Sequence, residues 1–74
     1  MDQNKEQKRE RFKRLGTQRT NLVLRRLKVL GNCANRSAYD YSEEEVNKIF
    51  SEIERRVRET KAKFHFLKNK EFKL

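Results

Sequence analysis

Apolar residues recur at helical spacing in two stretches of this 74-residue chain. In residues 5–30 they fall on one broad face when the sequence is wound at about 100° per residue, which predicts an amphipathic helix. This face consists of Phe12, Leu15, Leu22, Val23, Leu27, Val29 and Leu30. We expect the helix to run through Gly16, although a break there would leave residues 1–15 as a separate arm. Gly31 is the expected end, because glycine tolerates positive φ at the end of a helix.

The second stretch begins with a clear helix-start signal. Ser42 is a favourable N-cap, and Glu45 follows at the spacing of a capping box. Glutamates at residues 43–45 suit the positive end of the helix dipole. An apolar face then repeats through Val46, Ile49, Phe50, Ile53, Val57 and Phe64. The pattern predicts a helix from residue 43 to about residue 66, about 36 Å long.

Two helices and no strand pattern indicate an all-α protein. We expect an antiparallel two-helix hairpin with a long ordered connecting loop over residues 31–41. The chain then has three parts: a basic helical arm (1–15), the helical hairpin (16–66) and a basic, aromatic tail (67–74). Hydrophobic residues make up 34% and charged residues 42% of the chain, so any core is thin. A third short element, a homodimer or a partner surface would complete it.

Positive charge gathers at both ends of the chain, whose net charge is +9. Residues 1–30 carry ten Lys/Arg against three acids, and residues 61–74 carry five against one. In an antiparallel hairpin both ends lie at one pole, where a cationic patch would attract nucleic acid. The candidates for phosphate contact are Lys8, Arg9, Arg11, Lys13, Arg14, Arg55, Arg58, Lys61 and Lys63.

The cations at the start of the first helix oppose the helix dipole, which favours a functional reason for them. A solvated or protein-docking arm is the alternative. No helix-turn-helix spacing, zinc pattern, RRM signature or KH loop is present. Few Asn, Gln or Arg residues are positioned to read base edges, so we expect phosphate contacts of low sequence specificity. RNA, single-stranded DNA and duplex DNA all fit this hypothesis.

A protein-interaction module is the second interpretation. Its contact residues would be Phe64, Phe66, Phe72 and Leu74, with the basic arm as a rim. Such a module would be a regulator or inhibitor from a phage or mobile element that docks on a host or effector protein. The two interpretations coexist if the partner is a nucleoprotein complex.

Catalytic and cofactor chemistry find little support in the sequence. His65 is the only histidine and Cys33 the only cysteine, so a metal site or a nucleophilic triad is not expected. No glycine-rich phosphate loop is present. We therefore expect a non-enzymatic protein without cofactors. No apolar run has the length of a membrane span, and the expected location is the cytoplasm.

Residues 27–50 read LKVLGNCANRSAYDYSEEEVNKIF. This stretch resembles small uncharacterised proteins of bacteria, phages and mobile elements with a core of the form LGN-x-SN-x-x-x-Y-x-Y-[ST]. In those proteins an acidic helix follows and ends near K-x-x-F, a pattern that Lys61 and Phe64 match. Ala34 stands where that core has serine. The resemblance covers roughly half of the chain and implies a prokaryotic or phage origin, with no particular activity.

Overall fold

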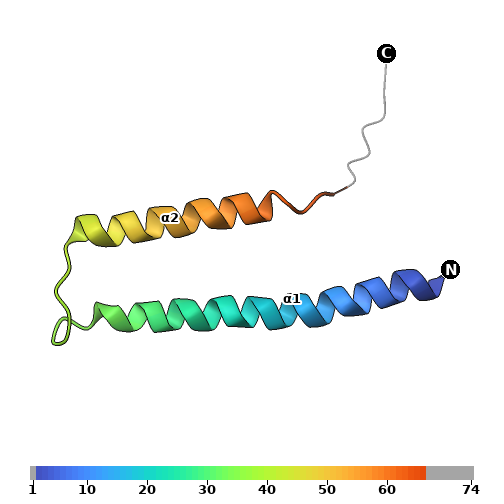
Figure 1. The fold of residues 1–74 in the computed structure, drawn as a ribbon, viewed down its shortest axis with the longest axis horizontal. Helices are drawn as coiled ribbons and strands as arrows, with labels where there is room; N and C mark the ends of the chain where they lie inside the picture. The colour runs from blue at the N-terminus through green and yellow to red at the C-terminus, as the bar shows by residue number, and fades with distance from the viewer. Residues whose placement is uncertain (1, 67–74) are drawn as a thin grey trace, which may run out of the picture. The chain divides into compact units, whose positions relative to one another are not determined.

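The computed structural model describes residues 2–66, with side chains described from residue 4. Every regular element in this range is helical (Figure 1). The elements are the α-helix α1 (Asp2–Gly31), the short 3-10 helix η1 (Asn32–Ala34) and the α-helix α2 (Glu43–Lys61). The predicted all-α class is therefore confirmed. The predicted tail, residues 67–74, lies outside the described residues.

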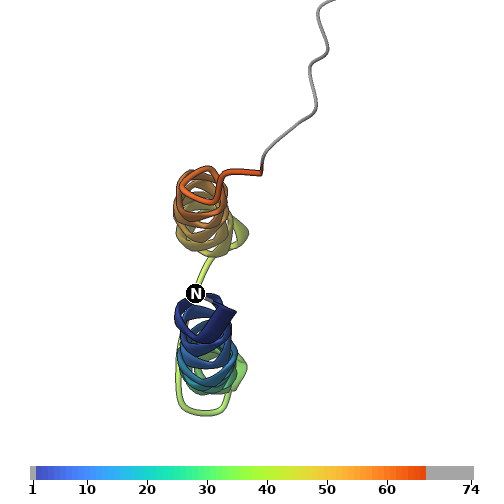
Figure 2. The ribbon, with the colours of Figure 1, turned by 90° about the vertical axis from the view of Figure 1, so that its right-hand side faces the viewer.

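Helix α1 contains 30 residues and is about 45 Å long. It begins at Asp2, earlier than predicted, and continues through Gly16 without interruption. Figure 2 shows α1 viewed nearly along its axis. The sequence supports this length because it lacks proline and is rich in Arg, Lys, Glu, Gln and Leu, which favour helices. Gly16 is therefore one glycine within a regular helix, and no helix break separates residues 1–15 from those that follow.

Gly31 is the last residue of α1, as expected. Its φ of −59° is right-handed, so the positive φ that glycine tolerates is not used at this position. The chain instead tightens into η1, and the Asn35 N–H donates to the Asn32 carbonyl at 3.4 Å. The Asn35 side chain then accepts a hydrogen bond from the Ser37 N–H at 3.0 Å. Local bonds of this kind, which asparagine forms readily, give residues 32–39 their turns.

Helix α2 begins where the sequence predicts, with Ser42 as N-cap. It ends at Lys61, so the predicted extension to residue 66 is wrong. The final turn closes with hydrogen bonds of three-residue spacing, from the Lys63 N–H to the Thr60 carbonyl and from the Phe64 N–H to the Lys61 carbonyl, both 3.1 Å. Aromatic residues and histidine follow, which are weaker helix formers than Ala, Leu or Lys. Phe64 therefore does not prolong the apolar face of α2.

The chain divides into two compact units, Met1–Asp40 with α1 and η1, and Tyr41–Leu74 with α2. Within the described residues no side chain is fully buried. Val46 and Ile53 on the apolar face of α2 are half-buried, and Val57 is exposed. Arg19 and Arg26, which interrupt the apolar face of α1, are exposed to solvent.

Candidate nucleic-acid interface

The first half of α1 holds five of the predicted phosphate contacts. They are Lys8, Arg9, Arg11, Lys13 and Arg14, and all five are exposed. Seven residues of helix make about two turns, and successive residues are about 100° apart. The cations are therefore dense along the helix axis and point to several sides of it.

These five cations have no carboxylate partner within the described residues. Glu10 stands three and four residues before Lys13 and Arg14, a spacing that permits ion pairs. No such pair forms within 4.0 Å in the structure. Each cation thus keeps its full charge for an external anion. All five lie beyond the first turn of α1, which begins at Asp2, so the helix dipole that the sequence suggested they oppose has little effect on them.

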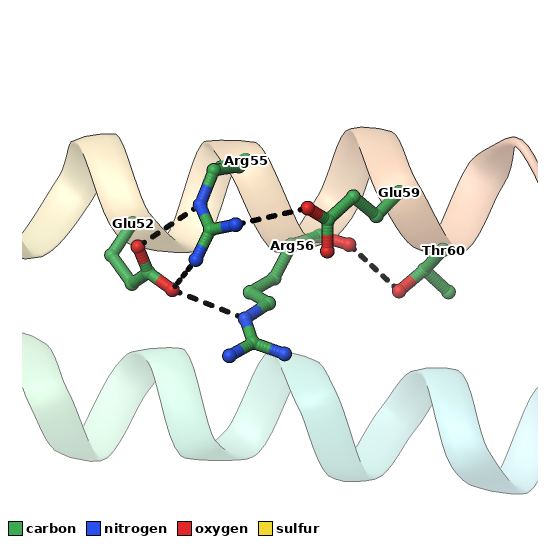
Figure 3. A network of polar contacts seen from close by, with 5 residues as sticks. All are labelled: Glu52, Arg55, Arg56, Glu59 and Thr60. Atoms are coloured by element: carbon green, nitrogen blue, oxygen red, sulfur yellow. Dashed lines mark hydrogen bonds and ion pairs between the residues drawn. The ribbon is translucent and has the colours of Figure 1, made fainter.

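Two arginines of α2, Arg55 and Arg56, differ from these cations because they form ion pairs with glutamates of their own helix (Figure 3). The Arg55 guanidinium donates to both Glu52 oxygens, at 2.6 Å and 3.2 Å, and to Glu59 at 3.0 Å. The Arg56 Nε donates to Glu52 Oε1 at 3.1 Å. Arg55, a predicted phosphate contact, is thus already neutralised by two carboxylates.

The pKa values in this network follow from its hydrogen bonds. Donation from Arg55, and then from Arg56, holds the pKa of Glu52 below its ordinary value. The same bond to Glu52 raises the pKa of Arg55 above its ordinary value. Glu52, Arg55 and Glu59 are about half exposed and Arg56 is more exposed still, so the network orders side chains on the surface of α2 more than it stabilises a core.

The three remaining predicted cations lie near the end of α2. Arg58, Lys61 and Lys63 are exposed and carry no carboxylate partner within residues 4–66. Arg58 and Lys61 lie in the last turn, where cations complement the negative end of the helix dipole. The helix dipole therefore accounts for Arg58 and Lys61, whereas it does not account for the five cations of α1.

The predicted protein-contact residues are only partly described. Phe64 and Phe66 follow α2 and are 55% and 82% exposed. Phe72 and Leu74 lie outside the described residues. The structure therefore presents two exposed aromatic side chains just after the last turn of α2.

Sequence reasoning missed a second feature of α1. Asn4, Gln7, Arg11, Arg14 and Gln18 are separated by three, four, three and four residues. In a continuous α-helix this spacing places all five on one face, and all five are exposed. The alternation was visible in the sequence, but it has this meaning only if the helix does not break at Gly16.

Chemistry of other kinds finds no support among the described residues. They contain no group of three or more His, Cys, Asp or Glu side chains that could hold a metal ion. Cys33 is a free, exposed thiol. Neither described α-helix has an apolar stretch that could cross a lipid bilayer.

Comparison with protein-family models, with curated proteins and with solved structures found no match. The resemblance of residues 27–50 to small prokaryotic and phage proteins stays a prediction.

Proposed function

We propose that this chain is a small, non-enzymatic nucleic-acid-binding protein that contacts phosphates through the cations of α1. One observation carries the proposal: five exposed cations within about two helical turns have no carboxylate partner among the described residues. Like charges at this density repel each other, because cations three and four residues apart are neighbours on the helix surface. A polyanion relieves this repulsion, and the counterions that it releases gain entropy.

The proposal includes an antiparallel hairpin of α1 and α2. Its support is the sequence pattern: apolar residues gather on one face of α1, interrupted by Arg19 and Arg26, and on one face of α2. Each helix thus has an apolar face that the other can cover. In this hairpin Arg58, Lys61 and Lys63 join the cations of α1 at one pole, whereas the glutamates of residues 43–45 lie at the other. A charge dipole of this kind orients the molecule on a polyanion.

A salt titration tests the phosphate contacts. Binding of mixed-sequence oligonucleotides is measured by fluorescence anisotropy at several salt concentrations. Five phosphate contacts predict a log–log slope of about −4.5 for duplexes or about −3.5 for single strands. An affinity weaker than about 100 μM at low salt would overturn the proposal, because non-specific binders reach that value at physiological salt.

Two matched variants refine the test. Arg11→Gln and Arg55→Gln each lower the net charge by one, but Arg55 is already paired with Glu52 and Glu59. We expect Arg11→Gln to make the slope less steep by about 0.9, and Arg55→Gln to change it much less. Equal effects would show that net charge alone matters and that α1 is not the contact surface.

Protein docking is the second candidate, and the exposed Phe64 and Phe66 favour it. In this case a phage or mobile-element regulator would place these aromatic rings in a pocket of a host protein. Capture of partners from lysate with and without nuclease separates the two functions. Loss of all partners after nuclease treatment favours nucleic acid, and recovery of the same proteins favours docking. A cytoplasmic location in a prokaryotic or phage-infected cell stays a prediction in both cases.

A further inference from the structure

One face of α1 collects side chains of the types that can hydrogen-bond to base edges. Asn4, Gln7, Arg11, Arg14 and Gln18 form a continuous row, which we call the reading row. It extends over about 21 Å of helix axis. All five side chains are exposed, and within the described residues none of them makes a hydrogen bond or an ion pair through its side chain.

These residue types share one chemical ability. The amides of Asn and Gln donate to and accept from adenine in bidentate fashion, and the guanidinium of Arg donates twice to guanine. An α-helix fits the major groove of B-form DNA, which is about 12 Å wide. We propose that α1 lies in the major groove of duplex DNA and reads base pairs through the reading row. This inference rests on the proposed function and replaces its expected low specificity with sequence recognition.

The flanks of the reading row fix how the helix would lie in the groove. Lys8 projects about 80° to one side of the row, and Glu10 projects about 80° to the other side. Lys5 lies beyond Lys8, and Glu6 lies beyond Glu10. Lys8 therefore faces one phosphate backbone, whereas Glu10 turns away from the other. Arg9 and Lys13 project about 180° and about 140° from the middle of the row, so they do not reach phosphates in this pose. The proposal thus predicts phosphate contacts from α1 to one strand only, and a salt slope less steep than that of five phosphate contacts.

Other nucleic acids match this face less well. The major groove of A-form RNA is deep and narrow, so side chains on a helix cannot reach its base edges. Proteins that bind single strands stack bases on aromatic side chains. In the first half of α1 only Phe12 is aromatic, and it projects about 120° away from the reading row. Duplex DNA is the partner that uses all five residues of the row.

A binding selection tests the inference with the full chain. Protein is incubated with duplexes that contain a randomised segment, and bound duplexes are amplified and sequenced over several rounds. We expect enrichment of a short motif. Each base pair read by a bidentate contact should discriminate against the wrong base by about 5- to 150-fold.

Two conservative variants assign the motif to the reading row. Arg11→Lys keeps the charge but removes the bidentate fork. Arg19→Lys makes the same change at an exposed residue of α1 outside the row, about 80° away from Arg11 on the helix. We expect Arg11→Lys to lose the preference at one position of the motif while its affinity for random duplex stays within about twofold. Arg19→Lys should leave the motif unchanged.

The outcomes separate this inference from the proposed function. Tight binding to duplexes without an enriched motif overturns the reading row and leaves phosphate binding standing. A motif that Arg11→Lys and Arg19→Lys alter equally also overturns the row, as does a preference for single strands or for double-stranded RNA. Absence of binding to every nucleic acid overturns both the inference and the proposed function.

Discussion

Ser42 and Glu45 satisfy each other's backbone at the start of α2. The Ser42 hydroxyl accepts a hydrogen bond from the Glu45 N–H at 3.1 Å, and the Glu45 carboxylate accepts one from the Ser42 N–H at 2.9 Å. The first N–H groups of a helix have no partner within the helix itself. This reciprocal pair fixes the residue at which α2 begins, and with it the helical phase of every side chain that follows.

Replacing the cap should therefore weaken α2. We expect Ser42→Ala to lower the stability of α2 by about 1 kcal/mol, because the N–H of Glu45 loses its acceptor. Amide hydrogen exchange of residues 45–48 measures the effect. Ser51→Ala is the matched control, since Ser51 is exposed within α2 and alanine is the better helix former there. Equal exchange rates in both variants would contradict the role of the cap.

Acid should also weaken α2, and the direction follows from two carboxylates. The backbone N–H of Ser42 lowers the pKa of Glu45, and Arg55 lowers that of Glu52. Folded α2 thus prefers the charged forms. Their stabilisation is complete above the ordinary glutamate pKa of about 4.3 and is lost as the pH falls through the lowered values. Titration of side-chain carboxyl chemical shifts by NMR checks this. A midpoint for Glu45 at or above the ordinary value contradicts the hydrogen bond.

The start of α2 was predictable because its signal is local. Ser42 and Glu45 act within one turn, and the spacing alone identifies them. The end of α2 was not predictable in this way. Neither glycine nor proline follows Lys61, and the helix stops where hydrogen bonds of three-residue spacing replace those of four. Phe64 continues the apolar periodicity, so the pattern predicted a longer helix than the structure contains.

Gly16 weakens α1 without a visible steric reason. A Cβ built on Gly16 would meet only the Phe12 ring, at 3.8 Å, which is ordinary van der Waals contact. We expect Gly16→Ala to stabilise α1 by up to about 1 kcal/mol, the propensity difference within a helix. Helicity from circular dichroism and thermal unfolding measure the gain. If the variant is instead destabilised, another helix packs closely against α1 at Gly16, and the added Cβ would clash with it.

The sequence predicted which residues give the candidate interface its positive charge, but not which of these cations form ion pairs with carboxylates. Counting Lys and Arg identified the five cations of α1, the three of α2 and Lys63 alike. Only the structure distinguishes Arg11, which has no carboxylate partner, from Arg55, which holds Glu52 and Glu59. The spacing of Glu10 and Arg14 is as favourable for a pair as that of Glu52 and Arg56, yet only the latter pair forms. A spacing of four residues allows a glutamate and an arginine to form an ion pair, but the rotamers of the two side chains determine whether the pair forms.

The last prediction concerns Glu52, which neutralises two arginines of α2. Glu52→Gln removes the carboxylate that binds Arg55 and Arg56 and frees their charges for phosphate. If α2 contributes to the interface, affinity for duplex DNA should rise and the salt slope should steepen by about 1. Glu54→Gln is the matched control, because it changes the net charge equally, lies two residues away, and Glu54 has no ion-pair partner among residues 4–66. Equal gains in both variants would mean that the freed arginines do not touch nucleic acid. The interface would then consist of α1 alone, and the proposed shared pole of the hairpin would have no part in binding.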